Sequence, residues 1–140
     1  MLLLSIHPEY VERILNGTKT VELRKRRPNV ELGSQVLIYS TMPEGKIVAQ
    51  ATISKIEVRT PSQLWKTVKK KCGVAKLAFD TYYDLAEKAV GIHLVDVVEL
   101  EVPLSLDAVR AMWPEFHPPQ QFRYLEQSHV DLMFGTECLS

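Results

Sequence analysis

Residues that could bind or transform a ligand are concentrated between Gly17 and Arg24. Lys19, Glu22 and Arg24 bring an ammonium, a carboxylate and a guanidinium into one short stretch. Apolar and polar residues alternate there, which is typical of a strand with one buried face. Glu22 and Arg24 therefore share a face, on which they can pair and present donors to a phosphate or a base edge. A solvated strand of alternating charge explains the same pattern, and periodicity alone leaves both interpretations open.

Two basic clusters accompany this segment and predict contacts with phosphates. The first follows Arg24 directly, and the second has no acidic residue among its cations. Because a run of charge is also common on a solvated face, that alternative stays open. The first cluster is Lys25, Arg26 and Arg27, and the second is Lys66, Lys69, Lys70, Lys71 and Lys76.

A third group of candidate ligand-binding residues lies late in the chain, after two prolines. Amides there can read base edges, and aromatic rings can stack on bases. The two aromatic residues of the group can equally be core residues that close a barrel. Tyr39 and Ser40, at the end of a predicted strand, are weaker candidates for a cleft wall. The late group is Gln120, Gln121, Phe122, Arg123 and Tyr124.

Signatures of other chemistries do not occur in the sequence. It contains no GxSxG motif, no glycine-rich phosphate loop and no HExxH motif. The histidines are scattered without the spacing of metal ligands, so we expect them to be surface or structural residues. We therefore expect neither a metal nor a cofactor. The histidines are His7, His93, His117 and His129.

The formal net charge is zero, with 17 basic and 17 acidic side chains. Residues 1–76 contain 14 basic and 6 acidic residues, a charge of +8, whereas residues 77–140 contain 3 and 11, a charge of −8. Such asymmetry points toward nucleic-acid contact. We expect the positive half to border the binding cleft.

Length and composition predict one globular domain over residues 1–140, since 46% of the residues are hydrophobic and 24% are charged. The apolar run from Met1 to Leu4 is too short for a signal or membrane segment and predicts a buried first strand. Cys72 and Cys138 lack CxxC spacing. We expect free thiols, a cytoplasmic location and no membrane partner. The oligomeric state stays open.

The rest of the chain predicts short helices around long strands. Pro8 begins a helix that Gly17 ends, and Thr60 with Gln63 forms a capping signature for another. Strands are predicted over 36–39, over 46–59 with a bulge near Ser54, and over 92–98. Helical spacing covers 74–88 and 106–112, and the tail is expected to be mainly irregular. This order predicts an α+β fold with a small mixed sheet or barrel.

The segment from Gly17 to Arg24 resembles the GxKxxExR motif of the ASCH family, a relative of the PUA RNA-binding domains. Gly17, Lys19, Glu22 and Arg24 match the motif. Similarity continues in the strand-helix opening, in the turn and strand at 33–39 and in residues 118–125, and it spans about residues 1–125. The resemblance implies a small PUA-like mixed β-barrel flanked by short helices. It also implies a cleft at the motif strand that binds RNA or a modified nucleoside.

Some small members that resemble this chain hydrolyse N4-acetylcytidine with the motif lysine, a threonine and a distal glutamate. Here Lys19 matches, but Glu22 occupies the threonine position, and the region aligned with the glutamate, residues 69–73, contains no acid. A neighbouring carboxylate holds Lys19 protonated, which disfavours its use as a base. The resemblance therefore favours a binding module. An amidohydrolase that uses Lys19 and Glu22, with Glu22 as a general base on water, and a metabolite-binding regulatory module stay open as alternatives.

Overall fold

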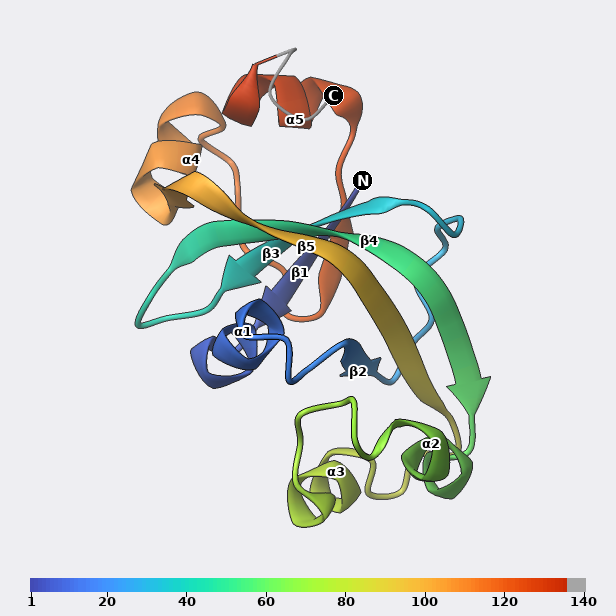
Figure 1. The fold of residues 1–140 in the computed structure, drawn as a ribbon. Helices are drawn as coiled ribbons and strands as arrows, with labels where there is room; N and C mark the ends of the chain where they lie inside the picture. The colour runs from blue at the N-terminus through green and yellow to red at the C-terminus, as the bar shows by residue number, and fades with distance from the viewer. Residues whose placement is uncertain (136–140) are drawn as a thin grey trace.

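The computed structural model describes residues 1–135, which form six strands and five helices (Figure 1). In chain order they are β1 (Leu2–Ile6), α1 (Pro8–Leu15), β2 (Val21–Arg24), β3 (Gln35–Ser40), β4 (Lys46–Arg59), α2 (Pro61–Val68), α3 (Lys76–Tyr82), β5 (Ala89–Ser105), α4 (Leu106–Met112), β6 (Phe122–Tyr124) and α5 (Gln127–Phe134).

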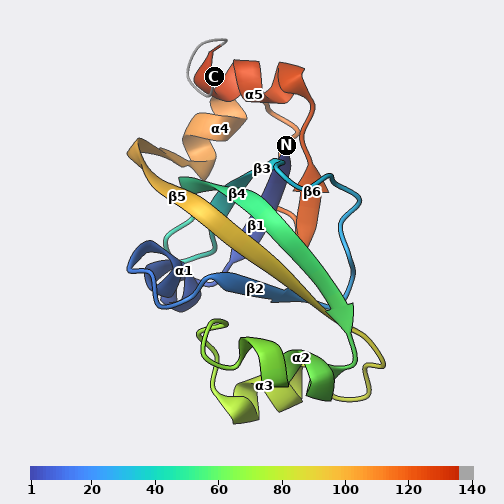
Figure 2. The ribbon, with the colours of Figure 1, turned by 45° about the vertical axis from the view of Figure 1, so that its right-hand side comes forward.

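The strands form one curled sheet, a half-barrel, in the order β2-β5-β4-β3-β1-β6. β1 pairs with β3 in parallel, and the other neighbours are antiparallel, so the sheet is mixed. Figures 1 and 2 show α2 and α3 at one end of the sheet and α4 and α5 at the other. The predicted α+β class with a small mixed sheet is confirmed. The sheet is open, and β2 and β6 are its two edges.

The hydrophobic core follows the alternation of the strands. In β1, Leu2 and Leu4 belong to a cluster with residues of α1, whereas Leu3 belongs to a second cluster with residues of α4 and α5. All five residues of β1 are buried because both of its faces are covered, which confirms the buried first strand. Val21 and Leu23 of β2 join a third cluster with residues of α2 and α3.

Several local signals act as the sequence predicts. Thr60 and Gln63 form a capping box at the start of α2. α1 begins at Pro8, and Gly17 follows its end with a φ of +86°, a conformation that glycine adopts without strain. The pairing of β4 with β5 shifts register beside Ser54, where the bulge was expected.

Other elements differ from the prediction. β5 continues through Pro103 to Ser105. The four residues 100–103 lie opposite a single residue of β4, Val48, so they form a bulge. Because Pro103 lies in this bulge, its missing N–H breaks no hydrogen bond between the two strands. α3 is shorter than the helical spacing over 74–88, and Leu85 has a positive φ of 63° after its end. The tail is more regular than expected, since it contains β6 and α5.

β2 was predicted to have one buried face, but all four of its residues are buried. Its apolar face packs under α2 and α3, and its charged face, with Glu22 and Arg24, lines a pocket. An edge strand covered on both faces cannot be distinguished from a half-exposed strand by alternation alone.

Cys72 is a free, buried thiol, and Cys138 lies outside the described residues. Within residues 1–135, no helix has the length and apolar character needed to cross a lipid bilayer.

Glu57 of β4 is the centre of a charged cluster on the sheet. Its carboxylate oxygens lie 3.0 Å from Nε2 of His93, 3.1 Å from Nζ of Lys55 and 3.4 Å from a terminal nitrogen of Arg59. Burial alone would raise the pKa of Glu57, but the hydrogen bonds and charges of His93 and Lys55 outweigh it and lower the pKa from 4.5 to about 2.

This cluster predicts a pH dependence of folding stability. Because folding lowers the pKa of Glu57, its contribution is complete above pH 4.5 and is lost as the pH falls through about 2. Since Lys55 and Arg59 are exposed and screened, we expect a contribution of about 1 to 2 kcal/mol. Urea unfolding at pH 7 and pH 3 measures it. Glu57→Gln should be less stable than the native protein at pH 7, and the gap should narrow at pH 3; an equal gap at both pH values would contradict the assignment.

Candidate functional site

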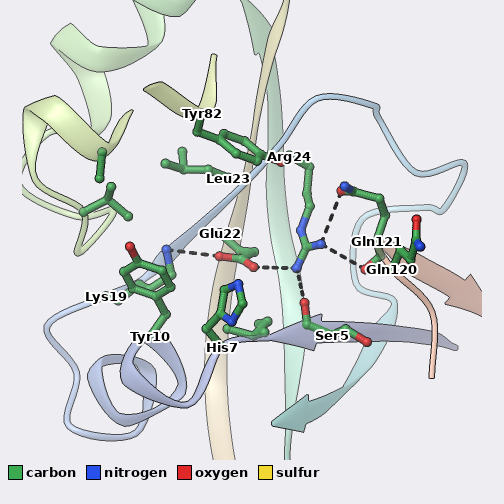
Figure 3. Close-up of a pocket in the computed structure, with 13 residues that line it drawn as sticks. Ser5, His7, Tyr10, Lys19, Glu22, Leu23, Arg24, Tyr82, Gln120 and Gln121 are labelled. Carbon is green, nitrogen blue, oxygen red and sulfur yellow. Dashed lines mark hydrogen bonds and ion pairs between the residues drawn. The ribbon is translucent and has the colours of Figure 1, made fainter. Parts of the chain in front are cut away.

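A pocket of about 230 Å³ lies between the end of β1, the charged face of β2, α1, α3 and the segment before β6 (Figure 3). Pockets for drug-sized ligands usually measure roughly 300 to 1,000 Å³, so this one suits a single small ring system. Its lining residues are Ser5, Ile6, His7, Tyr10, Lys19, Glu22, Leu23, Arg24, Val74, Ala78, Tyr82, Gln120 and Gln121.

The floor of the pocket is a network of three buried charges. Lys19 is 1% exposed, Glu22 is 6% exposed and Arg24 is 5% exposed. Nζ of Lys19 lies 3.1 Å from one carboxylate oxygen of Glu22, and a terminal nitrogen of Arg24 lies 2.6 Å from the other. Figure 3 shows the two cations on opposite sides of the carboxylate. The carboxylate is therefore fixed from both sides.

Arg24 also connects the two edges of the half-barrel. From edge strand β2 its guanidinium donates to the backbone oxygen of Ser5 at 2.7 Å and to the backbone oxygen of Gln121 at 2.9 Å. Ser5 belongs to β1, and Gln121 directly precedes β6, the opposite edge strand. One side chain thus bridges a gap that no ladder of backbone hydrogen bonds closes.

The loop between α2 and α3 holds the other end of the network through its backbone carbonyls. The oxygen of Lys71 accepts from the N–H groups of Thr20 and Val21, and the oxygen of Cys72 accepts from Nζ of Lys19 at 2.6 Å. Gly73, with a φ of +63°, lies so close to Lys19 that a Cβ atom there would be 2.8 Å from the Cβ of Lys19. The loop therefore contacts the lysine through the carbonyl of Cys72 and holds the start of β2 through the carbonyl of Lys71.

The ionisation of the pocket is set by the same contacts. Burial would raise the pKa of Glu22, but the charges and hydrogen bonds of Lys19 and Arg24 outweigh it and keep the pKa below its usual value. Burial raises the pKa of Tyr10 and of Tyr82, so both phenols stay protonated at neutral pH. The floor therefore contains an ionised carboxylate, and the pocket lining includes two protonated phenols.

The first basic cluster borders this pocket. Lys25 lies over the ring of Tyr82, with Nζ 4.9 Å from the ring centre, and Arg26 lies 5.9 Å from the ring centre of Phe122. Arg27 is exposed like the other two. These contacts place the cluster between the pocket wall and β6.

The second basic cluster lies on α2, on the loop after it and at the start of α3. All of its lysine side chains are exposed, and none lines the pocket, although Val74 of the same segment does. The segment therefore borders the pocket through its apolar residues. The cluster is Lys66, Lys69, Lys70, Lys71 and Lys76.

Tyr39 and Ser40, predicted as possible cleft-wall residues, do not line this pocket. β3 is flanked by β1 and β4, so both residues are buried inside the sheet. Tyr39 belongs to the hydrophobic cluster under α4 and α5. Their burial follows from the central position of β3, which the sequence does not reveal.

The late group divides in two. Gln120 and Gln121 line the pocket, whereas the three residues after them form β6. Phe122 packs against the core, and Arg123 stacks on Trp113 at 4.4 Å. The Tyr124 ring is half exposed, and its hydroxyl accepts a hydrogen bond from the N–H of Asn29.

The sequence reasoning missed four polar or aromatic residues of the pocket. Ser5 and His7 lie at the end of β1 and directly after it, where neither carries a recognisable motif. Tyr10 and Tyr82 lie in helices at a spacing that does not separate a pocket wall from a core residue. Tyr10 lies in the first turn of α1, and Tyr82 is the last residue of α3.

The chain belongs to the ASCH domain family, whose model matches residues 4–106. A relative from Zymomonas mobilis, named an ASCH domain-containing ribonuclease, is 28% identical over 127 residues, which cover 91% of this chain and 85% of the relative. The family resemblance on the motif residues is thereby confirmed.

Solved structures support the same family and fold. The crystal structure of ASCH from Zymomonas mobilis matches with a TM-score of 0.90 at 26% identity, covering 96% of this chain and 94% of that one. The N-terminal domain of Staphylothermus marinus McrB has a TM-score of 0.61 at 10% identity, covering 96% and 93%, and shows a similar fold alone. The predicted PUA-like ASCH fold is therefore confirmed.

The buried network makes Lys19 important for stability. Lys19→Met keeps the aliphatic volume but leaves one oxygen of the buried Glu22 carboxylate and the carbonyl of Cys72 without their partner, so we expect a loss of about 3 to 5 kcal/mol in the free energy of unfolding. Urea denaturation measures the loss. Lys46→Met, at an exposed position on β4, is the matched control and should change stability by less than about 0.5 kcal/mol. A Lys19 variant as stable as this control would refute the structural role.

Proposed function

We propose that this ASCH protein binds RNA and that the pocket receives one base or nucleoside. The observation that carries the proposal is the pocket itself, whose charged floor and tyrosine walls suit a flat polar ring. Aromatic walls beside polar groups are a common arrangement for an unstacked base. The name of the Zymomonas relative supports RNA as the polymer. Lys19 and Arg24 orient Glu22, and Gln120 and Gln121 are available at the rim.

Phosphate contacts belong, in this proposal, to the basic residues outside the pocket floor. Lys25 and Arg26 border the wall at Tyr82 and the strand β6, so a backbone that leaves the pocket can follow them. Arg27 and the second cluster extend the positive surface. Neutralising phosphates in this way makes affinity depend strongly on salt.

RNA affinity as a function of salt tests the phosphate contacts. For a single-stranded oligonucleotide in filter binding, Lys25→Ala and Arg26→Ala should each weaken binding and reduce the slope of log affinity against log salt by roughly 0.7. Lys46→Ala, which removes an exposed cation from a groove lined by several glutamates, should leave the slope unchanged. Reversal of Lys69, Lys70 and Lys71 to Glu should weaken binding further. Equal slopes for every variant would contradict the proposal.

Cleavage of RNA is a second candidate, favoured by the ribonuclease name of the Zymomonas relative. The pocket contains one imidazole among its lining residues, His7. Histidine is the side chain most often used for proton transfer. Lys19 is unsuited to that task, since its ammonium is held by three acceptors, and this also disfavours amide hydrolysis with Lys19 as the base.

His7→Ala separates the two candidates. If the pocket cleaves RNA, the substitution should lower the cleavage rate by about 10²-fold or more while changing affinity much less. Labelled RNA analysed on a denaturing gel gives the rate, and filter binding gives the affinity. If the native protein binds RNA without cleaving it, cleavage is excluded and RNA binding stays as the proposed function. Cleavage unchanged by the substitution would exclude His7 from the reaction.

A cytoplasmic location and an organisation as one domain over residues 1–140 stay predictions of the sequence.

A further inference from the structure

The hydrogen bonds of Lys19 decide what the pocket floor can offer to a ligand. An ammonium has three N–H donors. In this structure Nζ of Lys19 has three acceptors: the backbone oxygen of Val21 at 3.0 Å, that of Cys72 at 2.6 Å and the Glu22 carboxylate at 3.1 Å. With every donor engaged and the side chain 1% exposed, Lys19 has no N–H left for a bound molecule.

Arg24 is committed in the same way. Its terminal nitrogens donate to Gln121 twice, at 2.9 Å to the backbone oxygen and 3.4 Å to the amide oxygen, and to Ser5 and Glu22. The remaining donor, Nε, has no partner within residues 1–135, but it is covered from solvent. The guanidinium fork therefore faces the protein, and the expectation that it faces a phosphate is not met by this geometry.

Glu22 keeps free acceptor capacity in the floor. A carboxylate has about four acceptor sites on its two oxygens. Each oxygen of Glu22 accepts one bond from a cation on its own side, so each keeps a further site. The lowered pKa of Glu22 keeps the group ionised and therefore without a donor of its own. Despite its two cations, the floor presents acceptors.

We propose that the pocket recognises guanine through Glu22, a specificity that rests on the proposed function. Two adjacent acceptors match a ligand edge with two adjacent donors, and guanine has such an edge, formed by its ring N1–H and its 2-amino group. Cytosine and adenine each have an edge with one amino group beside a ring nitrogen that is an acceptor. The second carboxylate oxygen repels that acceptor. Uracil has one N–H between two carbonyls. A carboxylate that is held rigid from both sides discriminates strongly among these edges.

The surroundings of Glu22 agree with this ligand. Tyr10 and Tyr82 both line the pocket, and a purine ring can stack against such rings. The carbonyl of guanine lies beside its N1–H, and the exposed amide groups of Gln120 and Gln121 are donors at the same rim. A phosphate suits Lys25 and Arg26 better than the floor, because both side chains are exposed.

Single-stranded RNA heptamers of uridine with one central nucleotide test the proposal on the native protein. The central nucleotide is guanosine, inosine, adenosine, cytidine or uridine, and affinity is measured by fluorescence anisotropy. Inosine differs from guanosine only by the missing 2-amino group. We expect the guanosine heptamer to bind at least about tenfold more tightly than the inosine heptamer, because a hydrogen bond to a charged group is lost. Adenosine, cytidine and uridine should bind no better than inosine.

The outcomes separate this inference from the proposed function. Guanosine and inosine heptamers that bind equally well, within twofold, would overturn guanine recognition and leave RNA binding intact. Failure of every heptamer to bind would overturn RNA binding, and guanine recognition with it. If the uridine heptamer binds more tightly than the guanosine heptamer, the floor presents donors, and guanine recognition is overturned.

Glu22→Gln supplies a second measurement, with Glu57→Gln as the matched control. The amide at position 22 replaces one acceptor by a donor, so the preference for guanosine over inosine should fall to about twofold or less. Glu57 lies outside the pocket, and its variant should keep the full preference. Circular dichroism verifies folding of both variants. If Glu22→Gln does not fold, the heptamer series on the native protein decides the question alone. A folded Glu22→Gln variant with an unchanged preference would overturn the inference.

Discussion

The ion network of Lys19, Glu22 and Arg24 is the interaction on which both the fold and the pocket depend. The half-barrel is open, and its edge strands β2 and β6 make no ladder with each other. Arg24 reaches from β2 to backbone oxygens of Ser5 and Gln121 near the opposite edge. Lys19 contacts both the Glu22 carboxylate and the backbone oxygen of Cys72, and so it joins Glu22 to the loop between α2 and α3. Three side chains thus link elements that are distant in sequence.

Burying these charges is costly unless each is paired and hydrogen-bonded. The network meets this condition through the Glu22 carboxylate and through backbone oxygens, which do not change protonation. Replacing it by apolar residues could give equal stability, so stability alone does not explain its presence. Its distinctive property is that it fixes an ionised carboxylate in a small pocket. Such preorganised groups recognise a ligand without reorganising when it binds.

The sequence predicted the parts of this arrangement that are local. The alternation of residues 19–24 placed Glu22 and Arg24 on one face, and the capping residues Thr60 and Gln63 identified the start of α2. The GxKxxExR motif identified the family. These signals succeed because spacing along a strand or helix determines which side chains are neighbours.

The parts that the sequence did not predict depend on distant or backbone contacts. Arg24 contacts Gln121, 97 residues away, and the carbonyl oxygens that surround Lys19 leave no trace in residue types. Tyr10 and Tyr82 occupy helical positions that a core residue would also fill. Tyr39 was a weaker candidate for a cleft wall at the end of a predicted strand, and it lies in β3, inside the sheet. The hydrogen bonds of the two motif cations to backbone oxygens also leave no pattern in the sequence.

A crystal structure of the protein with guanosine 5′-monophosphate tests the central claim most directly. The account predicts the base between Tyr10 and Tyr82, with N1 and the 2-amino nitrogen each within hydrogen-bond distance of a Glu22 oxygen. The phosphate should lie outside the floor, toward Lys25 and Arg26, while Lys19 and Arg24 keep their present partners. A phosphate bound directly to Lys19 and Arg24, or a base that does not contact Glu22, would contradict the account.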